Sequence, residues 1–206
     1  MLKKLILIVV VLAVLAFLFM RSLEDTRSDP YAVAPAHIDA WTVEVTPDAA
    51  GNAPVLSLRT RPELVSNLSR QIFLRVMESV ASPQHSFIPL VLRSEFERAF
   101  AGRMTVEELA AAARAAGLDT ARPELRCLAH RRQSSGRNVQ QVYFVIVQSP
   151  AIAAFREDLA RRAGGAFDAA ALSPVVIVAN SESSFERWLP IQATEAECVA
   201  PIAIEG

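Results

Sequence analysis

The sequence predicts an α+β fold: an N-terminal single transmembrane helix followed by one domain of mixed β-sheet packed with helices. Three observations predict it. Residues 5–20 form an uninterrupted apolar run, later segments switch repeatedly between strand-like and helix-like periodicity, and strand pairs occur beside strand–helix–strand connections. Such a mixture is typical of a sheet with helices packed on it. We expect an anchor at residues 1–21, a linker at 22–40, an extracytoplasmic domain at 41–190 and a C-terminal tail at 191–206.

The apolar run at residues 5–20 has no polar side chain, and Lys3, Lys4 and Arg21 flank it. As a helix it covers about 24 Å, and the flanking basic side chains can reach the headgroups, so it can span a bilayer. A cleaved signal peptide is the alternative, although bulky residues occupy the region where small residues mark a cleavage site. Because Lys3 and Lys4 precede the run, the positive-inside rule places that end in the cytoplasm. We therefore expect a single-pass protein of the cytoplasmic membrane, with its domain outside the cytoplasm and the lipid bilayer as a partner.

The domain is predicted to begin with a hairpin and a long helix. Residues 41–46 and 55–60 alternate apolar and polar side chains on either side of a turn, which predicts two paired strands. From Pro62, apolar residues recur at three- and four-residue steps, which predicts an amphipathic helix over residues 62–80. We interpret its apolar stripe as core packing; a surface that binds a partner is the alternative. The stripe includes Leu68, Ile72 and Phe73.

A buried strand and two short helices occupy the middle of the domain. Residues 87–92 are apolar, and Pro89 places this strand at an edge or a bulge because proline has no N–H group for the ladder. The capping boxes at residues 94–97 and 105–108 each begin a helix. These two helices are expected to end at Gly102 and Gly117.

Two apolar strands form the centre of the predicted sheet. Residues 124–131 and 139–147 flank a polar loop and predict a hairpin. Residues 142–147 and 175–178 are apolar at every position, as in strands that are covered on both faces. A helix from Pro150 connects them, so we expect them to be neighbours in parallel orientation, directly or with one strand between them.

The connecting helix starts at Ser149, which is a favourable N-cap residue. We expect Phe155 and Leu159 to pack over the sheet and Arg156 to be exposed. Truncating Phe155 to alanine should then cost about 3–5 kcal/mol, and truncating Arg156 about 0.5 kcal/mol or less. The chain is expected to end with a short helix that carries Phe185 and Trp188 and with an irregular tail.

Cys127 and Cys198 are the two cysteines of the chain. Outside the cytoplasm such a pair can form a disulfide, which would join the tail to the domain; two separate buried thiols are the alternative. Their spacing matches neither a metal knuckle nor a redox C-x-x-C motif. No His, Cys or carboxylate cluster has metal-ligand spacing, so we expect no metal and no cofactor.

The candidate binding residues are His85, His130 and Arg132. His85 precedes the strand at 87–92, while His130 and Arg132 are alternate residues of one strand and therefore share a face. Together they could bind an anion or another ligand by charge-assisted hydrogen bonds; a solvated sheet edge is the alternative. No nucleophile elbow, metalloprotease motif or nucleotide-binding loop is present, so no catalytic residue is assigned. A net charge of −1 without a basic cluster argues against nucleic-acid binding.

Within residues 142–188, the order of strand-like and helix-like segments is similar to that of a known family. The segments VYFVIVQSPAIAAFREDLA, Phe167-Asp168 and SPVVIVANSESSFERW follow one another within residues 142–188. This order resembles the second half of a 2H phosphoesterase (LigT-like) domain, in which a strand and a helix lead to a strand with a His-x-Thr/Ser motif. Val175 and Ile177 stand where the resemblance implies the histidine and threonine, and Phe87 and Pro89 stand at the analogous place of the earlier strand. The resemblance implies a related fold whose phosphoesterase chemistry is lost, because two histidines are needed as acid and base.

The sequence thus favours a membrane-anchored domain that binds or scaffolds an unidentified protein partner without catalysis. An active or degenerate hydrolase of the 2H type is the alternative. A cleft that gathers His85 and His130 with arginine side chains would favour the hydrolase.

Overall fold

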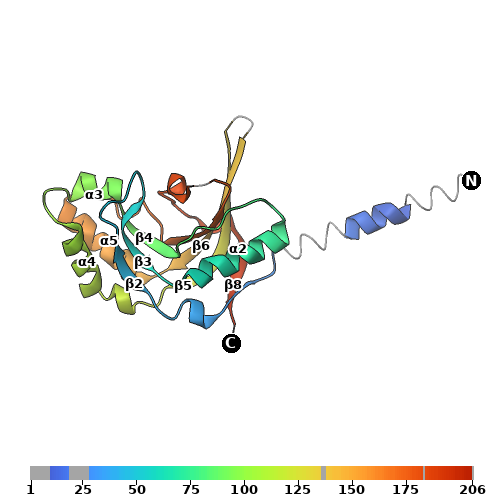
Figure 1. The fold of residues 1–206 in the computed structure, drawn as a ribbon, viewed down its shortest axis with the longest axis horizontal. Helices are drawn as coiled ribbons and strands as arrows, with labels where there is room; N and C mark the ends of the chain where they lie inside the picture. Colours follow the sequence, from blue (N-terminus) through green and yellow to red (C-terminus); the bar gives the residue numbers. More distant parts are fainter. Residues whose placement is uncertain (1–9, 19–27, 136–137, 183, 206) are drawn as a thin grey trace, which may run out of the picture.

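The computed structural model describes residues 10–18, 28–135, 138–182 and 184–205. Residues 10–18 are helical, and the rest of the predicted anchor lies outside the described residues. Within the described part of the chain, no helix is both long and apolar enough to cross a membrane. The sheets and helices of residues 28–205 form the mixed α+β fold that the sequence predicts (Figure 1).

The strands form two sheets that meet in the middle of the molecule. The larger sheet contains, in spatial order, β1 (Tyr31–Val33), β8 (Cys198–Ile204), β5 (Glu124–Ser135), β6 (Asn138–Gln148) and β7 (Val175–Asn180). The smaller sheet contains β2 (Thr42–Val45), β3 (Pro54–Arg59) and β4 (Phe87–Leu92). Because β4 packs beside β7, the two sheets together form one curled layer.

Helices cover this layer. In residues 28–205 the α-helices are α2 (Pro62–Val76), α3 (Arg93–Ala99), α4 (Val106–Ala115) and α5 (Pro150–Ala163). Short 3-10 turns are η1 (Pro35–His37), η2 (Leu118–Thr120), η3 (Phe185–Trp188) and η4 (Glu195–Glu197).

The predicted helix starts depend on side-chain caps, and most are confirmed. At α4, Thr105 and Glu108 each accept a hydrogen bond from the other's backbone N–H group. At α5, the Ser149 hydroxyl accepts from the N–H group of the third helical residue. α3 begins earlier than its sequence pattern indicates, because the carboxylate of Glu95 accepts from the N–H group of Leu92.

β6 is buried on both faces, as its apolar sequence predicts. Val145 belongs to the main core cluster, which also contains Ile72 of α2. Phe144, which points to the opposite face, belongs to a second cluster that contains Trp188. The predicted core residues Leu68, Phe155 and Leu159 are also buried.

β6 and β7 are neighbours, but the predicted parallel orientation is wrong. The two strands are antiparallel, with Ile146 opposite Val175 and Val142 opposite Asn180. The chain leaves β6 along α5 and returns through residues 164–174, so β7 starts at the end of the sheet where β6 stops. β7 is also the last strand of the larger sheet, with β4 beside it, and not a central strand.

Arg156 is buried, although the sequence predicts it to be exposed. Its exposed fraction is 2%. From α5 it donates hydrogen bonds to the carbonyl oxygens of Asp168 and Ala169 in the returning segment, and to that of Leu90 in β4. We predicted exposure from the charge of the side chain alone. The prediction is wrong because these carbonyl groups replace water as hydrogen-bond partners of the guanidinium group.

The predicted linker and tail both contribute a strand to the larger sheet. β1 lies within residues 22–40 and β8 within residues 191–206; β8 pairs parallel with β1 and antiparallel with β5. β8 was not predicted because Pro201 interrupts its apolar run, and proline is unfavourable inside a sheet. Cys127 of β5 and Cys198 of β8 form a disulfide, with their Cα atoms 5.7 Å apart.

α2 is shorter than predicted, and one predicted core residue on it is exposed. The helix ends at Val76, and Met77 has a left-handed conformation. Phe73 is 53% exposed, so its prediction as a core residue is wrong. Each helical residue turns the side-chain direction by about 100°, which carries Phe73 past the edge of the buried stripe that ends at Ile72.

Candidate functional site

A cleft of roughly 250 Å³ lies between the polar face of the smaller sheet and the segment that follows β7. One wall comes from the strands β2, β3 and β4, and the other comes from Phe185 and Glu186 at the start of η3. The remaining lining residues are Glu44, Thr46, Ala53, Pro54, Ser57, Arg59, His85 and Phe87.

Strand alternation builds the polar wall. Glu44 of β2 lies directly opposite Ser57 of β3, and Arg59 follows two residues along β3. Since alternate residues of a strand point to the same face, these three side chains project together, while their neighbours Leu56 and Leu58 are fully buried.

Arg59 joins the two ionisable side chains beside it. Its Nη1 atom lies 2.7 and 2.9 Å from the two carboxylate oxygens of Glu44, and its Nη2 atom lies 3.2 Å from Nδ1 of His85. A guanidinium group can only donate, so Nδ1 of His85 is the acceptor in this contact. Glu44 and Arg59, the charged side chains of this wall, are therefore paired with each other.

The opposite part of the cleft is aromatic and opens into a small apolar recess. Phe87 and Phe185 pack edge to face, with ring centroids 5.4 Å apart. Behind them, Pro89 of β4, Ile177 of β7 and Leu189 line the recess, and His85 stands at its mouth. The cleft therefore offers an apolar surface next to a polar wall.

Carboxylates dominate the charge of the cleft. Glu44 is neutralised by Arg59, whereas Glu186 accepts a hydrogen bond from the Ser184 hydroxyl and forms no ion pair within the described residues. An adjoining hollow of roughly 360 Å³ is also lined by His85 and Glu186, and it adds Glu182. Glu182 forms an ion pair with Arg187 at 3.3 Å, so the carboxylate of Glu186 is what gives the elongated surface of both hollows its excess negative charge.

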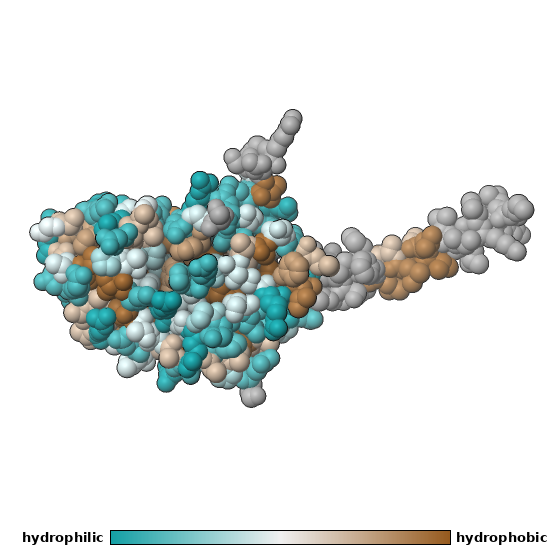
Figure 2. All heavy atoms as spheres, in the orientation of Figure 1, coloured by the Kyte–Doolittle hydropathy of each residue, from teal (hydrophilic) through white to brown (hydrophobic). Residues whose placement is uncertain are grey.

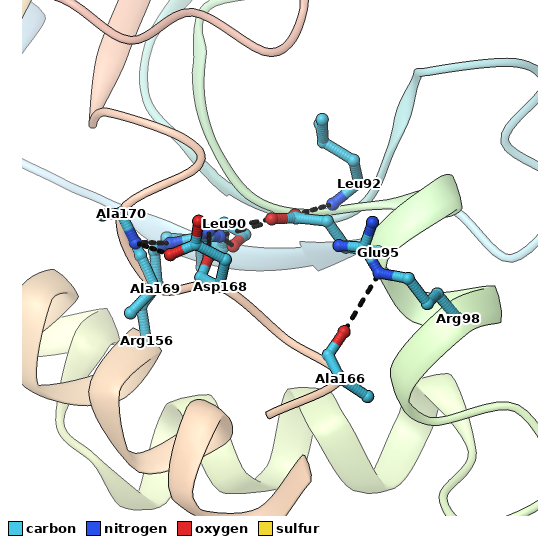
Figure 3. Close-up of polar contacts among 9 residues, drawn as sticks. All are labelled: Leu90, Leu92, Glu95, Arg98, Arg156, Ala166, Asp168, Ala169 and Ala170. Carbon is cyan, nitrogen blue, oxygen red and sulfur yellow. Dashed lines mark hydrogen bonds and ion pairs between the residues drawn. The ribbon is translucent and has the colours of Figure 1, made fainter. Parts of the chain in front are cut away.

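A buried ion pair holds β4, one of the strands that form the wall of the cleft. Figure 3 shows Arg156 between Glu95 of α3, Leu90 of β4 and the returning segment after α5. Arg156 Nη2 lies 2.8 Å from Glu95 Oε1, and both side chains are at most 6% exposed. Leu90 immediately follows Pro89 in β4, so the ion pair fixes the position of this strand behind the cleft. Its burial gives it a structural role and not a binding one.

The structure does not bring all the predicted site residues together. His85 lines the cleft, whereas His130 and Arg132 are absent from its lining. His130 stacks on Tyr143 with ring centroids 4.3 Å apart, and its Nε2 atom lies 3.3 Å from Gln141 Oε1. Arg132 is exposed on the same face of β5, as predicted from strand alternation.

Burial lowers the pKa of His130, and the positive charge of Arg132 acts in the same direction. The hydrogen bond with Gln141 and the nearby carboxylate of Glu78 oppose this effect. Half-buried on β5, His130 is therefore held toward its neutral form, and its ring packs on that of Tyr143.

Sequence reasoning missed Arg59, Glu44, Phe185 and Glu186. A signal for the first two was present, because the polar positions of the two alternating strands fall on one face once the strands are paired. Phe185 and Glu186 could not be placed, since nothing in the sequence indicates which sheet the turn η3 packs against. Among the described residues, no group of His, Cys, Asp and Glu side chains could hold a metal ion.

No family model, curated protein or solved structure matches this chain. The geometry alone therefore describes the class of protein: an α+β domain with an elongated cleft in which the carboxylate of Glu186 lies beside aromatic rings and faces a polar wall.

Proposed function

We propose that the chain is a single-pass membrane protein whose domain lies outside the cytoplasm and binds a protein partner without catalysis. The apolar run at residues 5–20 supports the anchor, because it is flanked by basic residues and lacks small residues at a cleavage position. The bond between Cys127 and Cys198 supports an oxidising compartment, where disulfides persist.

The elongated cleft is the observation that carries the binding role. Its volume of roughly 250 Å³ lies below the range of about 300–1,000 Å³ typical of small-molecule sites, and it continues into the adjoining hollow. An extended peptide segment fits such a shape better than a compact metabolite. Within the cleft, Arg59 and Glu44 neutralise each other, so neither is free to act as an acid, a base or an anion receptor.

The charge and the aromatic wall indicate which segment is preferred. Glu186 is the carboxylate of the cleft without a basic partner among the described residues, and Phe87 and Phe185 present ring surface beside it. A basic side chain next to an apolar one satisfies both features, through a charge-assisted hydrogen bond and a cation–π contact. We therefore propose a partner segment that carries lysine or arginine beside an apolar residue.

Selection from a library of short peptides on the full chain in nanodiscs tests this proposal. Peptides with lysine or arginine beside an apolar residue should be retained, with affinity about tenfold above their acidic counterparts, as expected for one partly desolvated ion pair. Glu186→Gln should abolish the preference for basic residues, and Thr46→Trp should block retention by filling the mouth of the cleft.

The matched control is Glu157→Gln, which removes the same charge from the exposed face of α5. This variant should keep the wild-type preference. Selection of acidic peptides, or equal selection by wild type and Thr46→Trp, would contradict the proposal.

The hydrolase of the 2H type is the second candidate, and one observation favours it. Phe87, Pro89 and Ile177, which stand where that family carries its catalytic motifs, line one recess with His85 at its mouth. A degenerate domain of this kind would keep the cleft and lose the chemistry, since its acid–base mechanism needs two histidines and His85 is the only one in this lining. Phosphodiester cleavage by the wild type that disappears in His85→Ala would favour an active hydrolase over the binding role.

A further inference from the structure

α2 carries a second apolar face that points away from the core. The exposed fractions of Phe73, Leu74 and Met77 are 53%, 68% and 81%. At about 100° per residue, Leu74 and Met77 point to the same side as exposed Arg70, opposite to the buried stripe of the helix, and Phe73 lies between them and the edge of that stripe. Single exposed apolar residues are normal on a protein surface, but three that adjoin on one helix face form a patch.

The backbone conformation at the end of α2 does not explain why Met77 is the most exposed of the three residues. Met77 is the C-cap residue with φ 55° and ψ 28°, a left-handed conformation in which glycine is favoured. The methionine side chain is 81% exposed, so it supports neither the backbone turn nor the core.

The patch lies where the chain enters the domain. Arg75, in the last turn of α2, donates hydrogen bonds to the carbonyl oxygens of Asp29 and Pro30, and its guanidinium group lies 4.1 Å from the ring centroid of Tyr31. These contacts fix the start of the domain beside the patch. In Figure 2, apolar side chains are exposed at the right-hand end of the domain, where α2 ends in Figure 1.

The length of the connecting chain limits how far this end can lie from the anchor. From residue 20 to residue 28 a fully extended chain reaches at most about 30 Å. If residues 5–20 span a bilayer, the last turn of α2 is thus tethered close to the lipid surface. Large apolar side chains with an arginine beside them are the composition of helices that lie in the membrane interface.

We propose that the C-terminal half of α2 lies on the outer surface of the membrane, with Phe73, Leu74 and Met77 inserted among the lipid headgroups. Arg70 then faces the phosphate groups of the lipids. This contact sets the orientation of the domain, because the tether and the patch together hold one end of it against the bilayer. The inference rests on the proposed anchor, and it adds the bilayer as the ligand of a surface within the domain.

Site-directed fluorescence on the full chain tests the proposal in vesicles of phosphatidylcholine and phosphatidylglycerol. The variants Leu12→Cys, Leu74→Cys and Glu107→Cys are each labelled with an environment-sensitive fluorophore, while the disulfide keeps the native cysteines unreactive. The label at position 74 should be blue-shifted and quenched by spin-labelled lipids whose quencher lies near the headgroups, as expected for insertion of about 5–10 Å. Position 107, exposed on α4, is the control and should show neither effect.

The three positions separate the possible failures. If position 12 reports lipid but position 74 behaves like position 107, the anchor is present and the proposed contact of α2 is wrong. If position 12 also reports water, the anchor fails and the contact fails with it. A blue shift at position 74 without quenching by lipid would mean that protein covers the patch, which also overturns the proposal.

Discussion

Arg156 connects three parts of the chain from inside the core. It donates to Glu95, to the carbonyl oxygen of Leu90 and to two carbonyl oxygens after α5. A charge at 2% exposure is stable only when each of its N–H groups finds an acceptor. The sequence held one clue: Arg156 lies four residues after Ile152 and three before Leu159, on the buried stripe. This position alone could not establish that Arg156 is buried, because its hydrogen-bond acceptors come from segments whose positions cannot be predicted from the sequence.

Replacing Arg156 should therefore be costly. Arg156→Met should lower the free energy of unfolding by about 3–5 kcal/mol, since it leaves the carboxylate of Glu95 buried without a partner. Urea unfolding of a fragment that starts at Ser28 measures the loss. Arg161→Met, which removes an exposed partner of Asp158 on the same helix, is the control and should cost about 0.5 kcal/mol or less.

The double variant Glu95→Gln/Arg156→Met separates the ion pair from the carbonyl contacts. It should remain less stable than the wild type by about 2 kcal/mol or more, because three carbonyl oxygens still lack a donor. Wild-type stability in the double variant would show that these backbone contacts contribute nothing.

Because His130 is partly buried, we expect it to make the free energy of unfolding depend on pH. Because burial lowers its pKa in the folded protein below the ordinary value of 6.5, the unfolded chain binds the proton more tightly. Its contribution to stability is present above pH 6.5 and is lost as the pH falls through the folded pKa. His130→Gln should remove this part of the pH dependence of urea unfolding. An identical pH profile for wild type and His130→Gln would contradict the assignment.

At the scale of the elements, local patterns were the most predictable feature. The caps at Thr105 and Ser149 involve only neighbouring residues, so the sequence contains all that they need. Strand direction and sheet order depend on distant contacts, and there the predictions were wrong for β7 and missed β8. In the cleft, only His85 was predicted.

The outer edges of both sheets are closed by side chains. At β1, Gln71 of α2 accepts from the N–H group of Ala32 and donates to its carbonyl oxygen. At β2, Asp119 accepts from the N–H group of Val43, and Arg114 donates to its carbonyl oxygen. Each pair of contacts occupies the groups that another strand would use, and so protects an edge from unwanted pairing.

Gln71→Met should open the edge at β1. The amide proton of Ala32 should exchange with solvent faster, and the domain should lose about 1–2 kcal/mol of unfolding free energy with these two hydrogen bonds. Hydrogen exchange measured by NMR on the fragment from Ser28 follows this amide directly. Ser66→Ala, on the exposed face of α2, is the control; equal exchange at Ala32 in both variants would argue against the role of Gln71.

At the scale of the whole molecule, the first and last strands of the domain are held together in the larger sheet. β1 and β8 lie side by side in the larger sheet, and the disulfide joins β8 to β5 across 71 residues of sequence. The segment that enters β1 is also held by Arg75 of α2, so both the sheet and α2 hold the point where the chain enters the domain. This arrangement agrees with the proposal that the domain is anchored at its N-terminal end.

Intact-mass measurement of the chain extracted from membranes, under denaturing conditions without reductant and after thiol alkylation, tests the anchored, extracytoplasmic domain most directly. The predicted mass includes the apolar run at residues 5–20 and shows no alkyl adduct, because the anchor is retained and Cys127 and Cys198 are bonded. A chain that starts between residues 21 and 40 would contradict the anchor, and two alkylated cysteines would contradict the oxidising compartment.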